Sequence, residues 1–328
     1  MRAMILAAGL GKRMRPLSEM RAKPALPVLG RPVIAWLLEW LHAHSVDDVM
    51  INLHYRPESV EQAARHFAPQ DMALHWSREP VTLGTGGGIA LARSYLEASD
   101  PAVVLAGDML LDVDLSALVE AHRASGAACT LVLRHDPRHQ QFGTIGVDTK
   151  GGVRRIARRF DLGGETRAGV FVGVRILSPE AFRHLPQRPE NTAFEDLSDW
   201  LAPALERGEI ALRGHLLEAD EIVWEPVGTP AEYLDANLSP PSVSFFSPTQ
   251  LVSKGTKLEG PEADVVLGRG ARIGAGAHLR RAVVWENEQV PENFRGSGGV
   301  FAAGRFYVCE ALHDTTSREP GDEERIDE

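Results

Sequence analysis

The most informative stretch of the chain reads Leu6-Ala7-Ala8-Gly9-Leu10-Gly11-Lys12-Arg13-Met14-Arg15-Pro16-Leu17-Ser18. An apolar run, residues 4–8, leads into this glycine-containing turn, and basic residues follow the turn at once. Glycine lets backbone N–H groups approach an anion closely, and arginine supplies a planar fork that suits phosphate. The stretch therefore predicts a strand that ends at a polyphosphate-binding turn.

The turn matches neither of two common nucleotide-binding motifs. A Walker A loop needs Ser or Thr after its lysine, and here Arg13 follows Lys12. The dinucleotide fingerprint Gly-x-Gly-x-x-Gly would need a glycine at Met14. A short glycine turn alone is a weak signal, because strand-to-helix turns often contain one. The added Arg13, Arg15 and Lys23 favour the phosphate interpretation over a purely structural turn.

Apolar strand-like and amphipathic helix-like segments alternate through the first 135 residues. Such alternation predicts an α/β, Rossmann-like three-layer domain with a mostly parallel central sheet and helices on both faces. Ligands bind at the carboxyl ends of strands in these sheets, so the Gly9 turn and Asp108 should open on the same edge. The expected strands are residues 3–8, 48–53, 73–77, 102–105 and 129–133, and the expected helices are 32–43, 57–66, 87–98 and 115–125.

Beyond residue 142 the sequence becomes richer in strands. Strands are expected at 143–148, 169–176 and 221–227, and helices at 179–184 and 194–206. The Leu-Ser-Pro-Pro-Ser run at 238–242 indicates a boundary. The expected organisation is one domain over residues 1–237, a linker over 238–260, a short left-handed β-helix-like segment over 261–310 and an acidic disordered tail over 311–328.

The β-helix prediction rests on a six-residue period. Leu267-Gly268, Ile273-Gly274 and Leu279 place an apolar residue, twice followed by glycine, at every sixth position. Only two hexads are clean, so a Gly/Ala-rich loop is the alternative. An acetyltransferase built on this segment is a minor alternative, because two hexads cannot build its pocket. The segment is better regarded as a candidate homo-oligomer contact.

Composition and charge exclude several classes of protein. The chain has 45 acidic against 35 basic residues and a formal net charge of −10, which argues against a general nucleic-acid binder. No apolar run approaches the roughly 20 residues of a membrane span. The two cysteines, Cys129 and Cys309, give neither a disulfide framework nor a metal-ligand spacing. These features predict a cytoplasmic protein with neither nucleic-acid nor membrane partners.

Two later segments add groups that could carry chemistry. Leu105-Ala106-Gly107-Asp108 closes an apolar strand with a carboxylate, which is a ligand that Mg²⁺ uses together with substrate phosphates. Taken alone, Asp108 could equally be a turn residue. Residues 79–88 form a second glycine-rich turn, whose amides could approach a base or ribose or could simply begin a helix. Asp114 is expected to cap the helix that follows it.

Together these segments resemble the sugar-1-phosphate nucleotidyltransferase family, in its mannose-1-phosphate guanylyltransferase-like branch. The resemblance spans about residues 1–237 and rests on residues 6–18, 22–28, 84–87, 107–108, 168–169 and 227–230. It implies transfer of a nucleotidyl group from a nucleoside triphosphate to a sugar-1-phosphate, with release of pyrophosphate. GTP and mannose-1-phosphate are the leading pair, and UTP, dTTP and ATP remain open. No covalent intermediate is needed, so catalysis would be positioning and charge neutralisation.

The same resemblance assigns roles to residues. Arg13 would clamp the triphosphate, Lys23 would contact the α-phosphate or the sugar phosphate, and Asp108 would hold Mg²⁺, so these three are the expected catalytic residues. Nucleotide binding is expected from Leu6, Ala7, Ala8, Gly9, Gly11, Lys12, Glu79, Gly84 and Thr85. Sugar-phosphate binding is expected from Gly143, Arg159 and Gly169.

Two positions depart from the family pattern. The family turn Asp-Val-Gly-Thr-Pro supplies a second metal ligand, but this chain has Pro226 in place of the aspartate. Glu225 could substitute only if its strand is bulged, because neighbouring strand residues face opposite sides. Members often have Glu-Lys-Pro where this chain has Arg158-Arg159-Phe160. The alternative function is therefore a catalytically weakened homologue that binds a nucleotide or nucleotide-sugar and regulates a partner.

Overall fold

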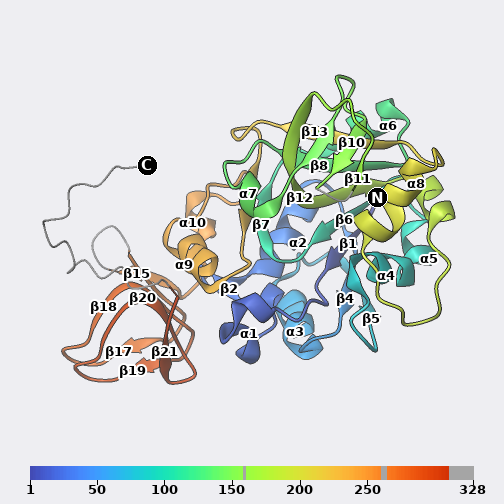
Figure 1. Ribbon diagram of the computed structural model, residues 1–328. Coiled ribbons are helices and arrows are strands. Elements are labelled where there is room, and N and C mark those ends of the chain that lie inside the picture. Colours follow the sequence, from blue (N-terminus) through green and yellow to red (C-terminus); the bar gives the residue numbers. More distant parts are fainter. Residues whose placement is uncertain (158–159, 260–263, 310–328) are drawn as a thin grey trace, which may run out of the picture.

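The computed structural model describes residues 1–157, 160–259 and 264–309 (Figure 1). It has the predicted α/β architecture with a mostly parallel central sheet. Four parallel strands form one half in the order β5-β4-β1-β6, and β12 joins them antiparallel to β6. These strands are β1 (Arg2–Leu6), β4 (Asp48–Leu53), β5 (Ala73–Arg78), β6 (Ala102–Ala106) and β12 (Arg167–Leu177).

The other half of the sheet is built on β12. Its outer neighbour β8 (Cys129–Arg134) is antiparallel to it and pairs in parallel with β13 (Leu212–Leu217). The first residues of β12 pair instead with β9 (Ile145–Val147), which continues to β10 (Val153–Ile156) and β11 (Phe160–Asp161). A separate antiparallel pair, β7 (Met109–Asp112) and β14 (Val223–Pro226), lies beside the sheet edge that carries Asp108.

Helices cover both faces of the sheet. The side chains of β1 alternate between the two faces, and each face needs helices to bury its apolar side chains. Ala3 and Ile5 face a core shared with α2 (Val33–Ala43), α3 (Pro57–Phe67) and α6 (Leu115–Ser125). Met4 faces the other core, which includes Ile89 of α4 (Gly84–Leu91) and Leu96 of α5 (Arg93–Leu96). The remaining helices are α1 (Leu17–Met20), α7 (His139–Phe142), α8 (Ala202–Glu206), α9 (Pro230–Leu238) and α10 (Pro248–Leu251).

The predicted elements of the first 135 residues are confirmed with small shifts. The expected helix over 87–98 is in fact two helices, α4 and α5, and begins three residues earlier at Gly84. Asp114 caps α6 as predicted, since its carboxylate accepts a hydrogen bond from the Ala117 amide at 3.0 Å. The expected helix over 194–206 is a π-helical turn, Leu197–Leu201, followed by α8, and 179–184 is a 3₁₀ turn.

The C-terminal segment consists of stacked parallel strands. β16 (Val265–Leu267), β18 (His278–Val284) and β20 (Arg295–Ala302) pair in parallel, and β17 (Arg272–Ile273) pairs with β19 (Gln289–Val290). Val265 pairs with Ala282 and Ala282 with Gly299, so one coil takes 17 residues. The Gly/Ala-rich loop alternative is therefore wrong, while the left-handed sense of the coil stays a prediction. Antiparallel strands β15 (Lys257–Glu259) and β21 (Arg305–Val308) flank the stack.

The glycines of the hexads are required by stacking between coils. A Cβ atom at Gly268 would lie 2.5 Å from the backbone nitrogen of Glu286, and one at Gly274 would lie 2.5 Å from that of Glu292. Only glycine fits against the next coil at these two positions. The six-residue spacing of glycine in the sequence therefore has a packing cause.

The C-terminal strands lie below α9 and α10 and share a hydrophobic core with the first domain (Figure 1). Trp285 donates its indole N–H to the Tyr233 hydroxyl at 3.0 Å, and that hydroxyl donates to the Pro27 carbonyl of β2 (Pro27–Val28) at 2.6 Å. Phe246, within the expected linker, is buried edge-on against Trp36. The division into domains stays a prediction, and the expected tail over 311–328 lies outside the described residues.

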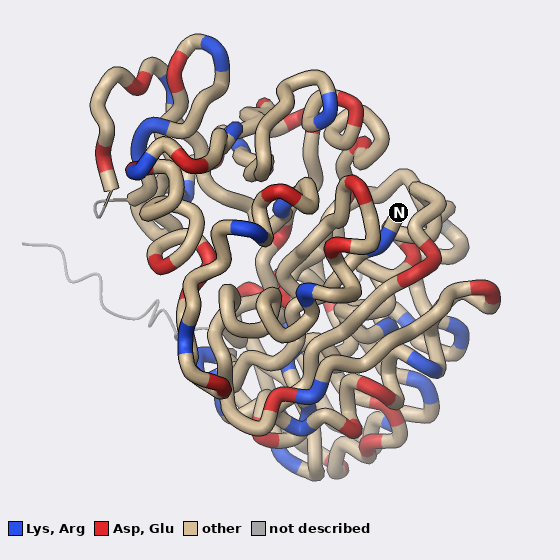
Figure 2. The backbone as a smooth tube through the Cα atoms, turned by 90° about the vertical axis from the view of Figure 1, so that its right-hand side faces the viewer, with Lys and Arg blue, Asp and Glu red and all other residues tan. Residues whose placement is uncertain are grey.

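Two properties of the whole chain bear on its partners. None of the helices in the described part of the chain has the length and apolar character needed to cross a membrane. Figure 2 shows basic and acidic residues interspersed along the chain rather than separated into blocks.

Cys129 is fully buried in β8, as expected for a core residue, and burial raises the pKa of its thiol.

Candidate active site

The predicted convergence at the sheet edge is confirmed. β1 and β6 are parallel neighbours, and the Gly107 amide donates to the Leu6 carbonyl at 2.9 Å. A Cβ atom at Gly107 would lie 2.7 Å from that oxygen, so glycine is needed for this approach. A cavity of about 350 Å³ opens here, and ten of the predicted site residues line it: Leu6, Ala7, Ala8, Gly9, Gly11, Lys23, Glu79, Gly84, Thr85 and Asp108.

Lys23 and Asp108 form the charged centre of this cavity. The Lys23 Nζ atom lies 2.7 Å from Asp108 Oδ2, although the residues are 85 positions apart in the chain. The lysine side chain is 11% exposed and the aspartate 39% exposed, so the pair is partly shielded from water. Coulomb interactions strengthen as water is excluded. A phosphate group entering the cavity would therefore meet a positioned ammonium group with a carboxylate beside it.

The turn after β1 is held by its own backbone. Gly11 adopts a φ of +60°, and its carbonyl accepts hydrogen bonds from the Ser18 hydroxyl at 2.8 Å and the Met14 amide at 3.0 Å. Lys12 and Arg13 begin the short 3₁₀ turn that follows, and both are exposed outside the cavity wall. Arg13 instead lies beside the turn after β14, since a Cβ atom built on Gly228 would be 3.6 Å from its guanidinium.

A buried hydrogen-bond relay joins three strand ends around the cavity. Asn52 at the end of β4 accepts from the Ala7 amide at 2.6 Å and donates to Glu79 Oε1 at 2.6 Å. The other oxygen of Glu79 accepts from the Leu83 amide at 3.0 Å. Burial raises the pKa of the Glu79 carboxyl, and these hydrogen bonds counteract part of that rise. Glu79 lies on the cavity wall as predicted, but its contacts within the chain hold the turns in shape.

The glycine-rich turn after β5 is packed against another segment of the chain. The amides of Gly86 and Gly87 donate to the Phe194 carbonyl at 3.0 and 3.2 Å, and a Cβ atom at Gly86 would lie 2.4 Å from the Phe194 ring. The amides of these two residues are therefore already bonded within the chain, and an approach of the turn to a base or ribose stays a prediction. Gly84 and Thr85 remain on the cavity wall, and the Thr85 hydroxyl donates to Glu195 at 2.7 Å.

Asn52 and a buried ion pair between Arg175 and Asp196 also lie at this cavity and were not predicted from the sequence. Arg175 of β12 lines the cavity, bonds to Asp196 and stacks over Phe171 at 4.8 Å. Asn52 and Arg175 each interrupt an apolar strand with a polar residue near the carboxyl edge or the cavity. A polar residue within an apolar strand could have marked each of them as a candidate site residue. The sequence could not show what each one binds, because its partner lies far away in the chain.

The two expected sugar-phosphate residues that the structure describes, Gly143 and Gly169, do not lie on the wall of the cavity that holds Lys23 and Asp108. Gly143 ends α7 with a φ of +73°, and neither it nor Gly169 lines the cavity. Gly169 is buried in β12, where a Cβ atom would lie 2.4 Å from Leu216 Cδ1, so close strand packing explains this glycine. Arg159 lies outside the described residues.

Comparison with known proteins agrees with this geometry. The family model described as nucleotidyl transferase matches residues 2–241. The chain belongs to the nucleotidyl transferase family. The match includes every residue that lines the strand-end cavity, and it stops three residues after the end of α9.

Two curated relatives and one solved structure illustrate the similarity. A UTP–glucose-1-phosphate uridylyltransferase of Synechocystis is 30% identical over 60% of this chain, which spans 54% of that protein. A mannose-1-phosphate guanylyltransferase of Mycobacterium tuberculosis is 29% identical over 88% of this chain and 80% of its own length. HddC from Yersinia pseudotuberculosis, solved with GMP-PN, has a TM-score of 0.59 at 22% identity, covering 72% of this chain and 97% of that chain.

Nucleotidyl transferases of this family generally use a divalent metal, and in this structure the segment that contains Pro226 lies beside Asp108. Val227 donates its amide to the Asp108 carbonyl at 2.8 Å, which brings the end of β14 beside Asp108. The residue before it is Pro226, whose side chain has no oxygen. Within the described residues, no group of three or more His, Cys, Asp and Glu side chains is arranged to hold a metal ion.

Glu225 does not take the place of the missing aspartate. The pairing of β14 with β7 runs without a register shift, with Glu225 opposite Leu110 and Pro226 opposite Met109, so the bulge that Glu225 would need is absent. Its carboxylate accepts instead from Arg138 Nη1 at 3.2 Å. Arg138 also bonds to Asp136, and these partners raise the pKa of its guanidinium.

Proposed function

We propose that this nucleotidyl transferase transfers a nucleotidyl group from a nucleoside triphosphate to a sugar-1-phosphate, giving a nucleoside diphosphate sugar and pyrophosphate. The observation that carries the proposal is the Lys23–Asp108 pair, 2.7 Å apart, which joins the 3₁₀ turn that begins at Lys23 to the carboxylate that follows β6. GTP and mannose-1-phosphate are the leading substrates, because the M. tuberculosis relative named for that reaction covers 88% of this chain. UTP and glucose-1-phosphate are the next pair, from the Synechocystis relative.

The residues supply positioning and positive charge. A phosphate oxygen of the sugar-1-phosphate attacks the α-phosphorus, a new P–O bond forms, and the bond to the leaving pyrophosphate breaks. Lys23 neutralises the phosphates that meet in the cavity, and the turn from Leu6 to Gly11 carries the nucleotide. Arg13, which is exposed beside the turn that follows β14, takes charge on the departing pyrophosphate. Such preorganised charge contributes most of the catalysis in reactions without a covalent intermediate.

The residues fit a divalent ion that is held jointly with substrate. Asp108 is 39% exposed and faces the cavity, and Mg²⁺ is often held by one or two carboxylates together with substrate phosphates. Asp108 would hold Mg²⁺ here, and the ion would neutralise phosphate charge and polarise the α-phosphorus. Because Pro226 supplies no second carboxylate, metal affinity should depend on bound triphosphate more than in relatives that have the aspartate.

A second candidate function is nucleotide or nucleotide-sugar binding without turnover, and the one observation that favours it is that Pro226 supplies no metal ligand. A chain that keeps the phosphate-binding half of the site and lacks one metal ligand could bind a nucleotide or nucleotide-sugar and regulate a partner without turnover. Tight binding of GDP-mannose together with no product over hours would favour this function over catalysis.

Pyrophosphate release tests the first function. Purified protein is incubated with Mg²⁺, each of GTP, UTP, dTTP and ATP, and either mannose-1-phosphate or glucose-1-phosphate. Release that requires both substrates, and is fastest for GTP with mannose-1-phosphate, is expected. A different fastest pair would replace the substrate assignment only. No release from any pair at high Mg²⁺ would rule out catalysis.

Four further features belong to the proposal. The described C-terminal coils are a left-handed β-helix, the catalytic domain ends near residue 237, the C-terminal segment mediates homo-oligomer contacts, and the protein is cytoplasmic. The 17-residue coil, close to three hexads, supports the first of these. Light scattering of the full chain would test the oligomer.

A further inference from the structure

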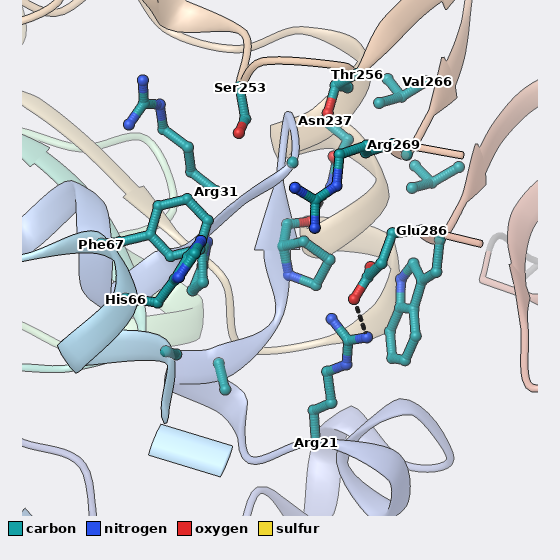
Figure 3. Close-up of a pocket in the computed structure, with 18 of the residues that line it drawn as sticks. Arg21, Arg31, His66, Phe67, Asn237, Ser253, Thr256, Val266, Arg269 and Glu286 are labelled. Atoms are coloured by element: carbon teal, nitrogen blue, oxygen red, sulfur yellow. Dashed lines mark hydrogen bonds and ion pairs between the residues drawn. The ribbon is translucent and has the colours of Figure 1, made fainter. Parts of the chain in front are cut away.

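A second and larger cavity lies at the junction between the first domain and the C-terminal coils (Figure 3). Its volume is about 1150 Å³, and it shares no lining residue with the cavity at Lys23 and Asp108. Segments near α1, β3 (Arg31–Pro32) and α3 form one side, and the segment after α10 with β16 and β18 forms the other. The two parts of the chain therefore build this cavity together.

The cavity is strongly basic in a chain whose net charge is −10. Its lining holds one carboxylate, Glu286, and five lysine or arginine residues: Arg21, Arg31, Arg65, Lys254 and Arg269. Glu286 is bonded to Arg21. Within the described residues the other four cations form no ion pair with a carboxylate of the chain, and the Arg65 guanidinium lies 4.9 Å from the centre of the Trp76 ring. Figure 3 shows Arg21 and Arg269 reaching into the space from opposite sides, with Glu286 beside them.

Arg31 lacks an acceptor that its environment calls for. Its guanidinium lies 4.5 Å from the centre of the Phe246 ring, and one terminal nitrogen donates to the Gln250 carbonyl at 3.0 Å. The Nε atom is buried and, within the described residues, has no hydrogen-bond partner. Burial lowers the pKa of this guanidinium. A buried donor without an acceptor costs free energy, so an anion nearby would be favoured.

We propose that this cavity is a binding site for a small metabolite that carries two or more phosphate groups. Arginine forks suit phosphate geometrically, and four unpaired cations on two sides of the cavity match a ligand with separated negative charges. Ser253 and Thr256 add hydroxyl groups on the C-terminal side. The volume of about 1150 Å³ is slightly above the roughly 300–1,000 Å³ of ordinary small-molecule sites, so the cavity has room for a ligand with several phosphate groups. A single phosphate would satisfy only part of the charge.

The position of the site connects it to both parts of the molecule. Arg31 and Arg65 come from the first domain, whereas Lys254 and Arg269 come from the C-terminal side. A polyanion between them would hold the two parts together. Arg21 also stands two residues before Lys23, so one short segment contributes to both cavities.

Titration calorimetry with inorganic tripolyphosphate, without metal and at physiological salt, tests the proposal. Because tripolyphosphate could also bind at Lys23, the reference protein is the full chain with Lys23→Ala. This variant is expected to keep one saturable site. Adding Lys254→Ala and Arg269→Ala, both at exposed positions, should weaken that site at least tenfold, and adding Arg272→Ala should not. Arg272 is an exposed arginine of β17 that does not line the cavity.

The outcomes separate this proposal from the catalytic one. Absence of saturable binding to the Lys23→Ala protein, or equal binding with and without Lys254 and Arg269, would overturn it. Charge-preserving Arg269→Lys should retain more affinity than Arg269→Ala, because it keeps the charge and loses only the fork, and this difference distinguishes lost charge from lost fold. Binding is measured without substrates, so a failure of turnover would leave this result intact.

Discussion

At the scale of single residues, the Lys23–Asp108 contact is what links two distant motifs into one site. The sequence allowed the Gly9 turn and Asp108 to be placed on the same sheet edge, because each follows an apolar strand, but it did not predict the contact between Lys23 and Asp108. Arg175 and Asn52 could not be placed in the same way. Their partners, Asp196 and Glu79, are fixed by how loops cross the sheet edge, and no local pattern encodes that crossing.

Pro226 is the residue whose replacement is most informative. Pro226→Asp would place a carboxylate beside Asp108, where the end of β14 meets the Asp108 backbone. We expect the variant to need less Mg²⁺ for half-maximal turnover and to raise kcat, by roughly tenfold or more, because a second metal carboxylate stabilises transition-state charge. Steady-state rates over a Mg²⁺ series measure this. The matched control is Glu225→Gln, which should change little, and a large loss there would mean that Glu225 serves the metal.

At the scale of elements, the strand ends are tied by the Asn52 relay. Asn52→Ala removes the acceptor of the Ala7 amide and the donor to Glu79, both buried. We expect a loss of about 1–3 kcal/mol in the free energy of unfolding, since a buried polar group is left unsatisfied. Urea denaturation provides the measurement. Substitution at an exposed strand position, such as Ala73→Ser in β5, should have little effect, and equal losses from both would contradict the relay.

His122 of α6 should make stability depend on pH. It is 1% exposed between the hydroxyls of Thr130 and Ser178, and burial lowers the pKa of its imidazole. As pH falls, His122 is therefore protonated in the unfolded chain, near pH 6.5, before it is protonated in the folded chain. The contribution of His122 to the free energy of unfolding is complete above pH 6.5 and is lost as pH falls below it. The slope should be at most about 1.4 kcal/mol per pH unit.

Denaturation of the native chain and of His122→Gln at pH 7.5, 6.5 and 5.5 isolates that contribution. Burial also lowers the pKa of His215. Its effect on the free energy of unfolding is the same in both proteins, so it cancels when the two values are subtracted. A difference between the two proteins that shrinks as pH falls is expected. A difference independent of pH would show that His122 does not resist protonation.

The elements themselves were predictable where periodicity was strong. Parallel strands with apolar cores and the helices α2, α3 and α6 follow directly from alternation. β13, which reads Leu-Arg-Gly-His-Leu-Leu, was missed because polar residues and glycine break its pattern. It is a strand because it pairs in parallel along the full length of β8, a tertiary contact that overrides its weak propensity.

At the scale of the whole molecule, the C-terminal coils are part of the folded core. Trp285 is 4% exposed, bonds to Tyr233 and lies 4.6 Å beneath the Arg21 guanidinium. We expect Trp285→Ala to cost about 3–5 kcal/mol in the free energy of unfolding, as large aromatic truncations do in a core. Thermal and urea unfolding measure the change. Ile273→Ala, on an exposed position of β17, should stay near the native value, and a small effect of Trp285→Ala would mean that the coils are only loosely attached.

The sequence predicted that hexads follow the first domain, but it did not predict how the two meet. The hexad glycines were visible, whereas the contacts of Trp285 and Phe246 with the first domain depend on which side of the coil faces α9. The same junction creates the basic cavity, whose five cations are scattered from Arg21 to Arg269 in the sequence. Because these cations come together only in the folded chain, no sequence motif indicates the cavity.

The central claim is that Lys23 and Asp108 form the centre of a nucleotidyl transfer site. Phosphorus NMR of the protein with Mg²⁺, GTP and mannose-1-phosphate tests it most directly, because it observes both products. We predict equal growth of the diphosphate signals of GDP-mannose and the signal of pyrophosphate, with a rate lowered about 10²–10³-fold by Lys23→Ala. Nucleotide-sugar formation at an unchanged rate in Lys23→Ala, or none in the native protein with any of the four triphosphates, would contradict the account.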